Sequence, residues 1–140
     1  DLIFAEVTRV VGDANDTMTE DAKLIGVTIH YTASVSSQVS INAQTGTTYT
    51  TVLTDASKLV TLNNGSAITL TIPPNSSVAY PVGTKIDLLQ IGAGQVTVAA
   101  GAGVTVNSTP TLKLRAQYSG GTCIQYAADT WIFAGDLAAS

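Results

Sequence analysis

Charged side chains are scarce in this sequence. Asp, Glu, Lys and Arg together make up 11% of the 140 residues, against roughly 25% in an average globular domain. The net charge is −4, and no cluster of Lys and Arg is present that could follow a phosphate backbone. We therefore expect no nucleic-acid partner.

Cysteine and histidine each occur once, as Cys123 and His30. A single cysteine cannot form an intrachain disulfide, and one Cys with one His cannot complete a zinc site. His30 has no activated Ser or Cys motif to serve, because the chain contains no G-x-S-x-G, and we interpret it as a surface or interface residue. We expect Cys123, in a strand-like run, to be a buried small hydrophobe. No cofactor is predicted.

Long apolar runs are also missing. No stretch of about 18 apolar residues could form a membrane-spanning helix, and no signal-peptide pattern opens the chain. Apolar residues nevertheless make up 45% of the total, far from the composition of a disordered protein. We therefore expect a well-packed core and no membrane partner.

The sequence does contain short runs in which apolar and polar residues alternate. In AITLTIP, at 67–73, Ile68, Leu70 and Ile72 fall on one face and two threonines on the other. Similar runs occur at 95–99, 104–106 and 112–118, each bounded by Gly, Pro, Asn or Ser. Period-two alternation predicts β-strands. We predict an all-β fold, an antiparallel β-sandwich or jelly-roll-like head with an N-terminal arm.

Two further strands are predicted to be apolar on both faces. They are KIDLLQI at 85–91 and TWIFAG at 130–135. Such strands need a cover on either side, and a domain of this size has few residues left for a third layer. We therefore expect the side chains of Leu89, Ile91 and Ile132 to lie in an oligomer interface.

Helix and turn signals are few. Residues 19–24 could form one or two helical turns capped by Thr19, and residues 54–58 a single turn. The tripeptide NNG at 63–65 predicts a hairpin turn, because Asn and Gly accept positive φ.

The composition changes near residue 41, before which six of the ten acids lie. We predict an N-terminal arm or small anchoring lobe at 1–41 and the β-sandwich head at 42–140. The acidic loop at 12–21 supplies oxygen ligands of the kind that bind Ca²⁺, but it lacks the central glycine and terminal glutamate of an EF-hand. We favour a solvated loop over a calcium site, whose ligands would be Asp13, Asn15, Asp16, Glu20 and Asp21.

The stretch GAGQVTVAAGAGVTVNS, at 92–108, invites comparison with a phosphate-binding loop. A dinucleotide fingerprint would need a third glycine opening a helix where Thr97 stands, and no G-K-[ST] follows as in a P-loop. We instead predict tight turns between three strands, with glycine supplying positive φ.

Two long segments carry a resemblance to a known class. They are TDASKLVTLNNGSAITLTIPPNSSVAYPVGTKIDLLQIGAGQVTVAAGAGVTVNS and LKLRAQYSGGTCIQYAADTWIFAGDL. Residues from about 49 to 138 resemble a module of tailed-bacteriophage virion proteins of the fibre and head-decoration type. The resemblance implies a non-enzymatic β module, often a homotrimer, on the outer surface of a particle assembled in the bacterial cytoplasm. A chain without disulfides fits that reducing compartment.

Three functions stay open at this point. A capsid decoration protein (cement or head fibre) would bind the major capsid protein or another virion protein and stabilise the assembled shell. A tail-fibre domain would bind a host-surface glycan, with Tyr80 and Tyr118 as the candidate contacts. A tailspike-type glycosidase would need two carboxylates across a cleft. Because no acid–base motif is present, we favour the decoration protein and assign no catalytic role to the isolated acids Asp87, Asp129 and Asp136.

Overall fold

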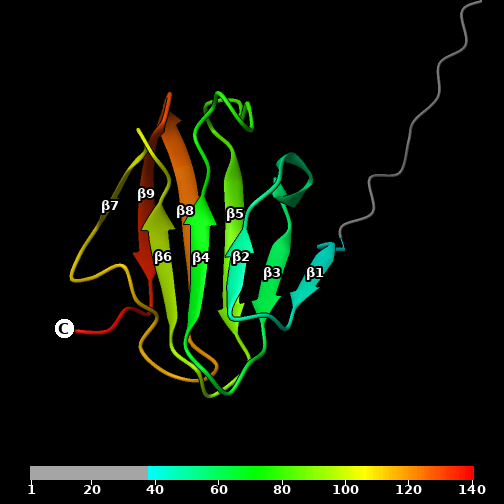
Figure 1. Ribbon diagram of the computed structural model, residues 1–140, viewed down its shortest axis with the longest axis vertical. Coiled ribbons are helices and arrows are strands. Elements are labelled where there is room, and N and C mark those ends of the chain that lie inside the picture. The colour runs from blue at the N-terminus through cyan, green and yellow to red at the C-terminus, as the bar shows by residue number, and fades with distance from the viewer. Residues whose placement is uncertain (1–37) are drawn as a thin grey trace, which may run out of the picture. The chain divides into compact units, whose positions relative to one another are not determined.

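The computed structural model describes residues 38–140. This part of the chain is all-β, as predicted, with one short 3-10 turn, η1 (Leu53–Asp55), and no α-helix. None of its helical segments is long and apolar enough to cross a membrane. The six-stranded sheet has the order β1 (Ile41–Gln44), β3 (Leu59–Leu62), β5 (Lys85–Gln90), β8 (Gly120–Ala127), β9 (Thr130–Gly135) and β7 (Thr105–Ser108). The three-stranded sheet has the order β2 (Thr48–Thr50), β4 (Ile68–Ile72) and β6 (Val96–Ala100) (Figure 1).

The first six strands build three stacked rungs, each with one strand in either sheet. Rung 1 consists of β1 and β2, rung 2 of β3 and β4, and rung 3 of β5 and β6. All four pairings between rungs are parallel. Asn42 therefore aligns with Val60, and Val60 with Leu88. This is the architecture of a β-solenoid, in which each repeat packs on its neighbours.

The prediction of an antiparallel sandwich or jelly roll is therefore wrong in its strand directions. Side chains alternate with period two in parallel and antiparallel strands alike, so the alternation does not report direction. The segment at 63–65, predicted as a hairpin turn, instead carries the chain from β3 in one sheet to β4 in the other. The turns after β1 and β5 do the same.

The C-terminal strands extend the large sheet with two antiparallel pairs and one parallel pair. β8 runs antiparallel to both β5 and β9, whereas β7 and β9 are parallel. The run at 112–118, predicted as a strand, is an irregular connection. Lys113 bridges to Thr97 and Leu114 bridges to Leu137, and since these partners lie on different segments, no longer ladder forms.

The core fills the space between the two sheets. In β4 the predicted inward residues Ile68, Leu70 and Ile72 are all buried, and in β6 so are Val96 and Val98. The largest buried side chains come from β9, where Trp131 and Phe133 have almost no exposed surface. For the alternating runs that form β4 and β6, the sequence therefore predicted correctly which side chains face the core. The single turn expected at 54–58 corresponds to η1.

Two glycines of the 92–108 stretch allow the turns of neighbouring rungs to touch. A Cβ on Gly92 would lie 2.2 Å from the carbonyl oxygen of Asn64. The N–H of Gly94 donates to the same oxygen at 2.9 Å, and the Asn64 side chain donates to the Thr45 carbonyl at 2.7 Å. Positive φ was predicted for the glycines of this stretch, but among them it occurs only at Gly103. Glycine is required at 92 and 94 because the backbones approach closely there, and not because these residues have a positive φ.

Candidate functional site

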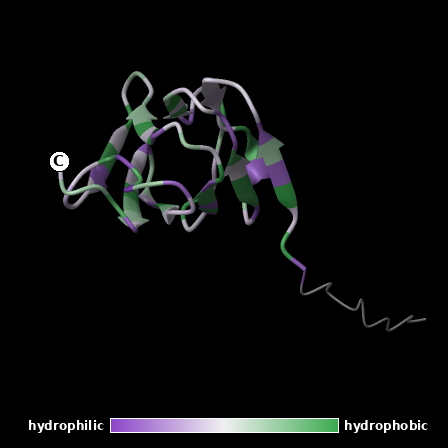
Figure 2. Cartoon of the chain, turned by 90° about the horizontal axis from the view of Figure 1, so that it is seen from below, coloured by the Kyte–Doolittle hydropathy of each residue, from purple (hydrophilic) through white to green (hydrophobic). Residues whose placement is uncertain are grey.

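Rung 1 places polar side chains at inward positions that the next rung fills with apolar ones. Asn42 aligns with Val60, Gln44 with Leu62, and Tyr49 with Leu70. In Figure 2 the strand next to the grey trace alternates hydrophobic green with hydrophilic purple. Hydrogen-bonding groups therefore cover this end of the apolar core.

The carboxylate of Asp55 is the centre of this network and has no exposed surface. Its Oδ1 accepts a hydrogen bond from Asn42 Nδ2 at 2.7 Å, and its Oδ2 accepts one from the Tyr49 hydroxyl at 2.7 Å. The backbone N–H of Val52 also donates to Oδ2, at 2.9 Å. Gln44 Nε2 in turn donates to Asn42 Oδ1 at 2.7 Å. A buried carboxylate is tolerated here because three donors replace water.

The surroundings of Asp55 keep two tyrosines protonated. Burial raises the pKa of Tyr49 to about 12, and the hydrogen bond to Asp55 and its negative charge add to the shift. Burial also raises the pKa of Tyr80 to about 12, opposed by the Thr51 hydroxyl and assisted by the charge of Asp55. Near neutral pH the Tyr49 phenol is a hydrogen-bond donor rather than a base. Within residues 38–140 rung 1 is the first repeat of the solenoid, and the network places polar groups at that end, as terminal repeats of such folds require.

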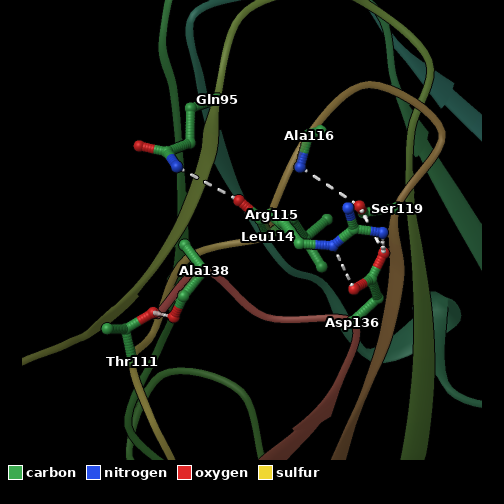
Figure 3. Close-up of polar contacts among 8 residues, drawn as sticks. All are labelled: Gln95, Thr111, Leu114, Arg115, Ala116, Ser119, Asp136 and Ala138. Carbon is green, nitrogen blue, oxygen red and sulfur yellow. Dashed lines mark hydrogen bonds and ion pairs between the residues drawn. The ribbon is translucent and has the colours of Figure 1, made fainter. Parts of the chain in front are cut away.

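A second polar cluster joins the connection after β7 to the segment after β9 (Figure 3). Arg115 donates from Nε and Nη2 to the two carboxylate oxygens of Asp136, at 2.6 and 2.7 Å. The Ser119 hydroxyl donates to Asp136 Oδ2 at 2.7 Å and accepts from the Ala116 N–H at 3.1 Å. The hydrogen bonds from Arg115 and then Ser119 hold the pKa of Asp136 below its usual value. The Thr111 hydroxyl joins the same two segments by donating to the Ala138 carbonyl, and Gln95, in the turn before β6, donates to the Leu114 carbonyl.

The cluster holds a turn that presents Tyr118 to solvent. The Ser119 N–H donates to the Ala116 carbonyl at 3.0 Å, and the Tyr118 N–H donates to the Gln90 backbone carbonyl at 2.7 Å. Tyr118 has φ +67°, a conformation that costs a non-glycine residue about 1–2 kcal/mol. Its side chain is 71% exposed. The turn thus carries an exposed aromatic ring on a fixed backbone.

The two tyrosines predicted to contact a glycan have different environments. Tyr118 is accessible, but Tyr80 is 2% exposed and packs edge-on against Trp131, with ring centroids 5.2 Å apart. The surface role predicted for Tyr80 is wrong, because the loop between β4 and β5 turns its apolar members Val78 and Tyr80 towards the core.

The predicted interface residues do not share one environment either. Ile132 is 38% exposed on the outward face of β9. Leu89 is half-buried on β5, and Ile91 is half-buried in the turn that follows it. The interface itself stays a prediction.

The isolated acids each have a local partner. Asp87 accepts from the Thr122 hydroxyl at 2.6 Å and pairs with Lys85 at 2.9 Å, while Asp129 accepts from the Asn75 N–H at 2.6 Å. Within residues 38–140 no three acidic, His or Cys residues gather as a metal site would require. Cys123 is fully buried, as predicted. The remaining predictions, for His30, the 19–24 helix and the calcium ligands Asp13, Asn15, Asp16, Glu20 and Asp21, lie outside the described residues.

The network around Asp55 was not predicted from the sequence. The sequence feature that could have indicated it is the pair of amides in INAQ. Asn42 and Gln44 are two residues apart and therefore lie on one face of the strand. Only the alignment of rung 1 with rung 2 shows that this face points towards the core.

Comparisons with known proteins identify no relative. No protein-family model matches the chain, and no curated protein or solved structure matches it.

Proposed function

We propose that this chain is a non-enzymatic bacteriophage virion protein, a homotrimeric capsid decoration protein of the cement or head-fibre type. One observation carries the proposal. The residues that resemble the virion module, about 49–138, hold rungs 2 and 3 and the C-terminal strands β7, β8 and β9 around a common core. A rigid, sparsely charged body of this kind is suited to a structural role on the outside of a particle.

The physical role follows from linkage. A protein that binds the assembled capsid but not free capsid subunits stabilises the assembly by mass action. Residues 1–41 are the segment we assign to attachment, and the stack at 42–140 is the body that projects from the shell.

Light scattering and co-sedimentation with empty capsids of the source phage test this proposal. We expect a trimeric mass, sedimentation with capsids, and a higher capsid melting temperature when the protein is bound. A monomer without affinity for capsids would contradict it. Tyr118→Ala is a useful companion variant, because capsid attachment should survive the loss of that ring.

A second function, glycan binding by a tail-fibre domain, is favoured by one observation. Tyr118 presents its ring to solvent on a turn held by the Arg115–Asp136 pair. Aromatic rings with one wet face commonly anchor binding partners. Under this function Tyr118→Ala abolishes binding to host-surface polysaccharide, whereas Leu53→Ala, at another exposed apolar residue, does not. Equal binding by both variants would remove Tyr118 from consideration.

A further inference from the structure

The outward face of β8 and β9 carries exposed apolar side chains. Ile124 on β8 lies directly opposite Ile132 on β9, and each is 38% exposed. Tyr126, two residues along β8, is 53% exposed. The inward neighbours Cys123 and Phe133 belong to the core. At these positions the two strands are therefore apolar on both faces, and their outward face lacks a cover among the described residues.

This face is electrically neutral. On the outward sides of β5, β8, β9 and β7, the charged residues within the described range are Lys85 and Asp87. Their charged groups are 2.9 Å apart. Lys85 aligns with Ile124, and Asp87 with Thr122, whose hydroxyl donates to it at 2.6 Å. The positive charge beside the apolar patch is thus already compensated.

The opposite margin of the face is held by a polar bond. Asn107 on β7 aligns with Ile132 and donates from Nδ2 to the Tyr126 hydroxyl at 2.8 Å. The phenol is thereby fixed across β8, β9 and β7. An aromatic side chain held in this way loses little conformational entropy on binding.

The charge pattern decides between possible partners. Nucleic acid and anionic lipid need uncompensated basic residues, and a charged protein needs charge of the opposite sign. A second copy of the same face needs neither, and two such faces approach without repulsion between like charges. Exposed apolar patches on folded domains mark interaction sites. Every copy of a closed homo-oligomer buries the same patches, and copies related by a three-fold axis bring the same face together at that axis.

We propose that the outward face of β8 and β9, centred on Ile124 and Ile132 and bordered by Tyr126, is the contact between copies of this chain. The inference rests on the oligomer part of the proposed function and is independent of its capsid part. It keeps Ile132 from the predicted interface, adds Ile124 and Tyr126, and places Leu89 at the margin, opposite Gly120. Ile91 lies in the turn after β5, outside this face.

The test is the native mass of the full chain, measured by light scattering and sedimentation over a concentration series. We expect the wild-type protein to be oligomeric. Ile132→Lys and Ile124→Lys each bury a charge without a partner in the contact and should raise the dissociation constant by on the order of tenfold or more. Because the contact is apolar, raising the salt concentration should not dissociate the wild-type oligomer.

A matched control is available in η1. Leu53 is 51% exposed, and Leu53→Lys adds the same charge away from β8 and β9, so its mass should equal that of the wild type. Thermal melting of every variant shows whether the fold is intact. Ile132→Thr keeps a β-branched side chain in the strand and serves if Ile132→Lys does not fold.

The possible results distinguish the contact between copies from the proposed virion function. Monomeric, folded β8 and β9 variants beside an oligomeric Leu53→Lys variant would support the contact. A monomeric wild type, or folded Ile132 and Ile124 variants with wild-type mass, would overturn it. Failure to bind capsids with these mass changes intact would count against the virion function alone.

Discussion

Gly94 lies so close to the backbone of Ser66 that a β-carbon on residue 94 would sit 1.9 Å from the Ser66 carbonyl oxygen. The turn between β5 and β6 therefore rests directly on the turn between β3 and β4. The spacing of parallel strands, about 4.8 Å, is maintained through the turns only because no side chain intervenes.

Gly94→Ala is expected to lower the free energy of unfolding by about 3 kcal/mol or more, because backbone atoms must move apart to admit the methyl group. Gly65→Ala is the matched control, since nothing lies within 4 Å of a Cβ at that position. Its effect should stay within about 0.5 kcal/mol. Urea denaturation of both variants is the measurement. Similar losses in the two would refute close packing of the turns as the reason for glycine.

Asp55→Asn should destabilise the protein by roughly 2–3 kcal/mol. The amide has one acceptor oxygen where the carboxylate has two, so buried donors from Asn42, Tyr49 or Val52 lose their partner. Tyr49→Phe removes one of those bonds and should cost about 1 kcal/mol. The exposed Thr48 on the same strand offers a control, and Thr48→Ala should change stability by less than about 0.5 kcal/mol. Equal unfolding midpoints for all three variants would show that the network does not stabilise rung 1.

Stability should decline as pH rises from about 10 to about 12. Tyr49 and Tyr80 have a pKa of about 12 in the folded chain, against 10.0 for an ordinary tyrosine. The folded state therefore binds more protons in this window, and the stabilisation present below pH 10 is lost as the pH passes the folded pKa values. Cys123, with its pKa raised by burial from 9.0 to about 12, acts in the same direction. Denaturant titrations between pH 9 and 12 measure the decline, which should become shallower in Tyr49→Phe. An identical slope in that variant would argue against the shift assigned to Tyr49.

The thiol of Cys123 should not react with alkylating or disulfide reagents while the protein is folded. It is fully buried, and burial raises its pKa to about 12, so thiolate is both scarce and shielded. Unfolding in guanidinium should restore stoichiometric labelling at the same pH. Rapid labelling of the folded protein would show that β8 opens readily from the core.

Arg115→Gln should loosen the turn that carries Tyr118 without unfolding the protein. The pKa of Asp136 is lowered by the hydrogen bonds from Arg115 and Ser119, so this contribution to stability is present above the carboxyl's unfolded pKa and is lost as the pH falls through its folded value. The variant should therefore lose less stability on acidification than the wild type does. Amide hydrogen exchange should rise at residues 116–119 and stay unchanged in β4. Unaltered exchange at 116–119 would mean that the backbone bonds of the turn suffice.

Alternation along single strands was enough to predict which side chains face the core. Ile68 and Leu70 on β4, and Val96 and Val98 on β6, are buried as the period-two pattern requires. The strand β9 was predicted to be apolar on both faces, so the pattern did not choose a side there, and the structure buries Trp131 and Phe133. The direction of the strands could not be predicted from the alternation. It depends on whether a turn such as the one at Asn64 returns beside the same strand or crosses to the other sheet, and both routes use the same turn residues.

The candidate sites were even harder to predict from the sequence than the strand directions. Asn42 and Gln44 would look like surface residues of an edge strand until rung 2 is placed beside them. Arg115 and Asp136 lie 21 positions apart in the chain, and only the pairing of Leu114 with Leu137 brings them together. Tyr80 was misjudged because its neighbours read as a loop, whereas packing against Trp131 decides its position.

The polar residues of rung 1 also fix where the stack of rungs begins, and so bear on its height. Within residues 38–140 they end the apolar core at one side, and β8 and β9 follow rung 3 at the other. The height of the stack between them is therefore a whole number of rungs. A duplicated internal rung would raise that height by one step of about 4.8 Å and would leave both ends unchanged.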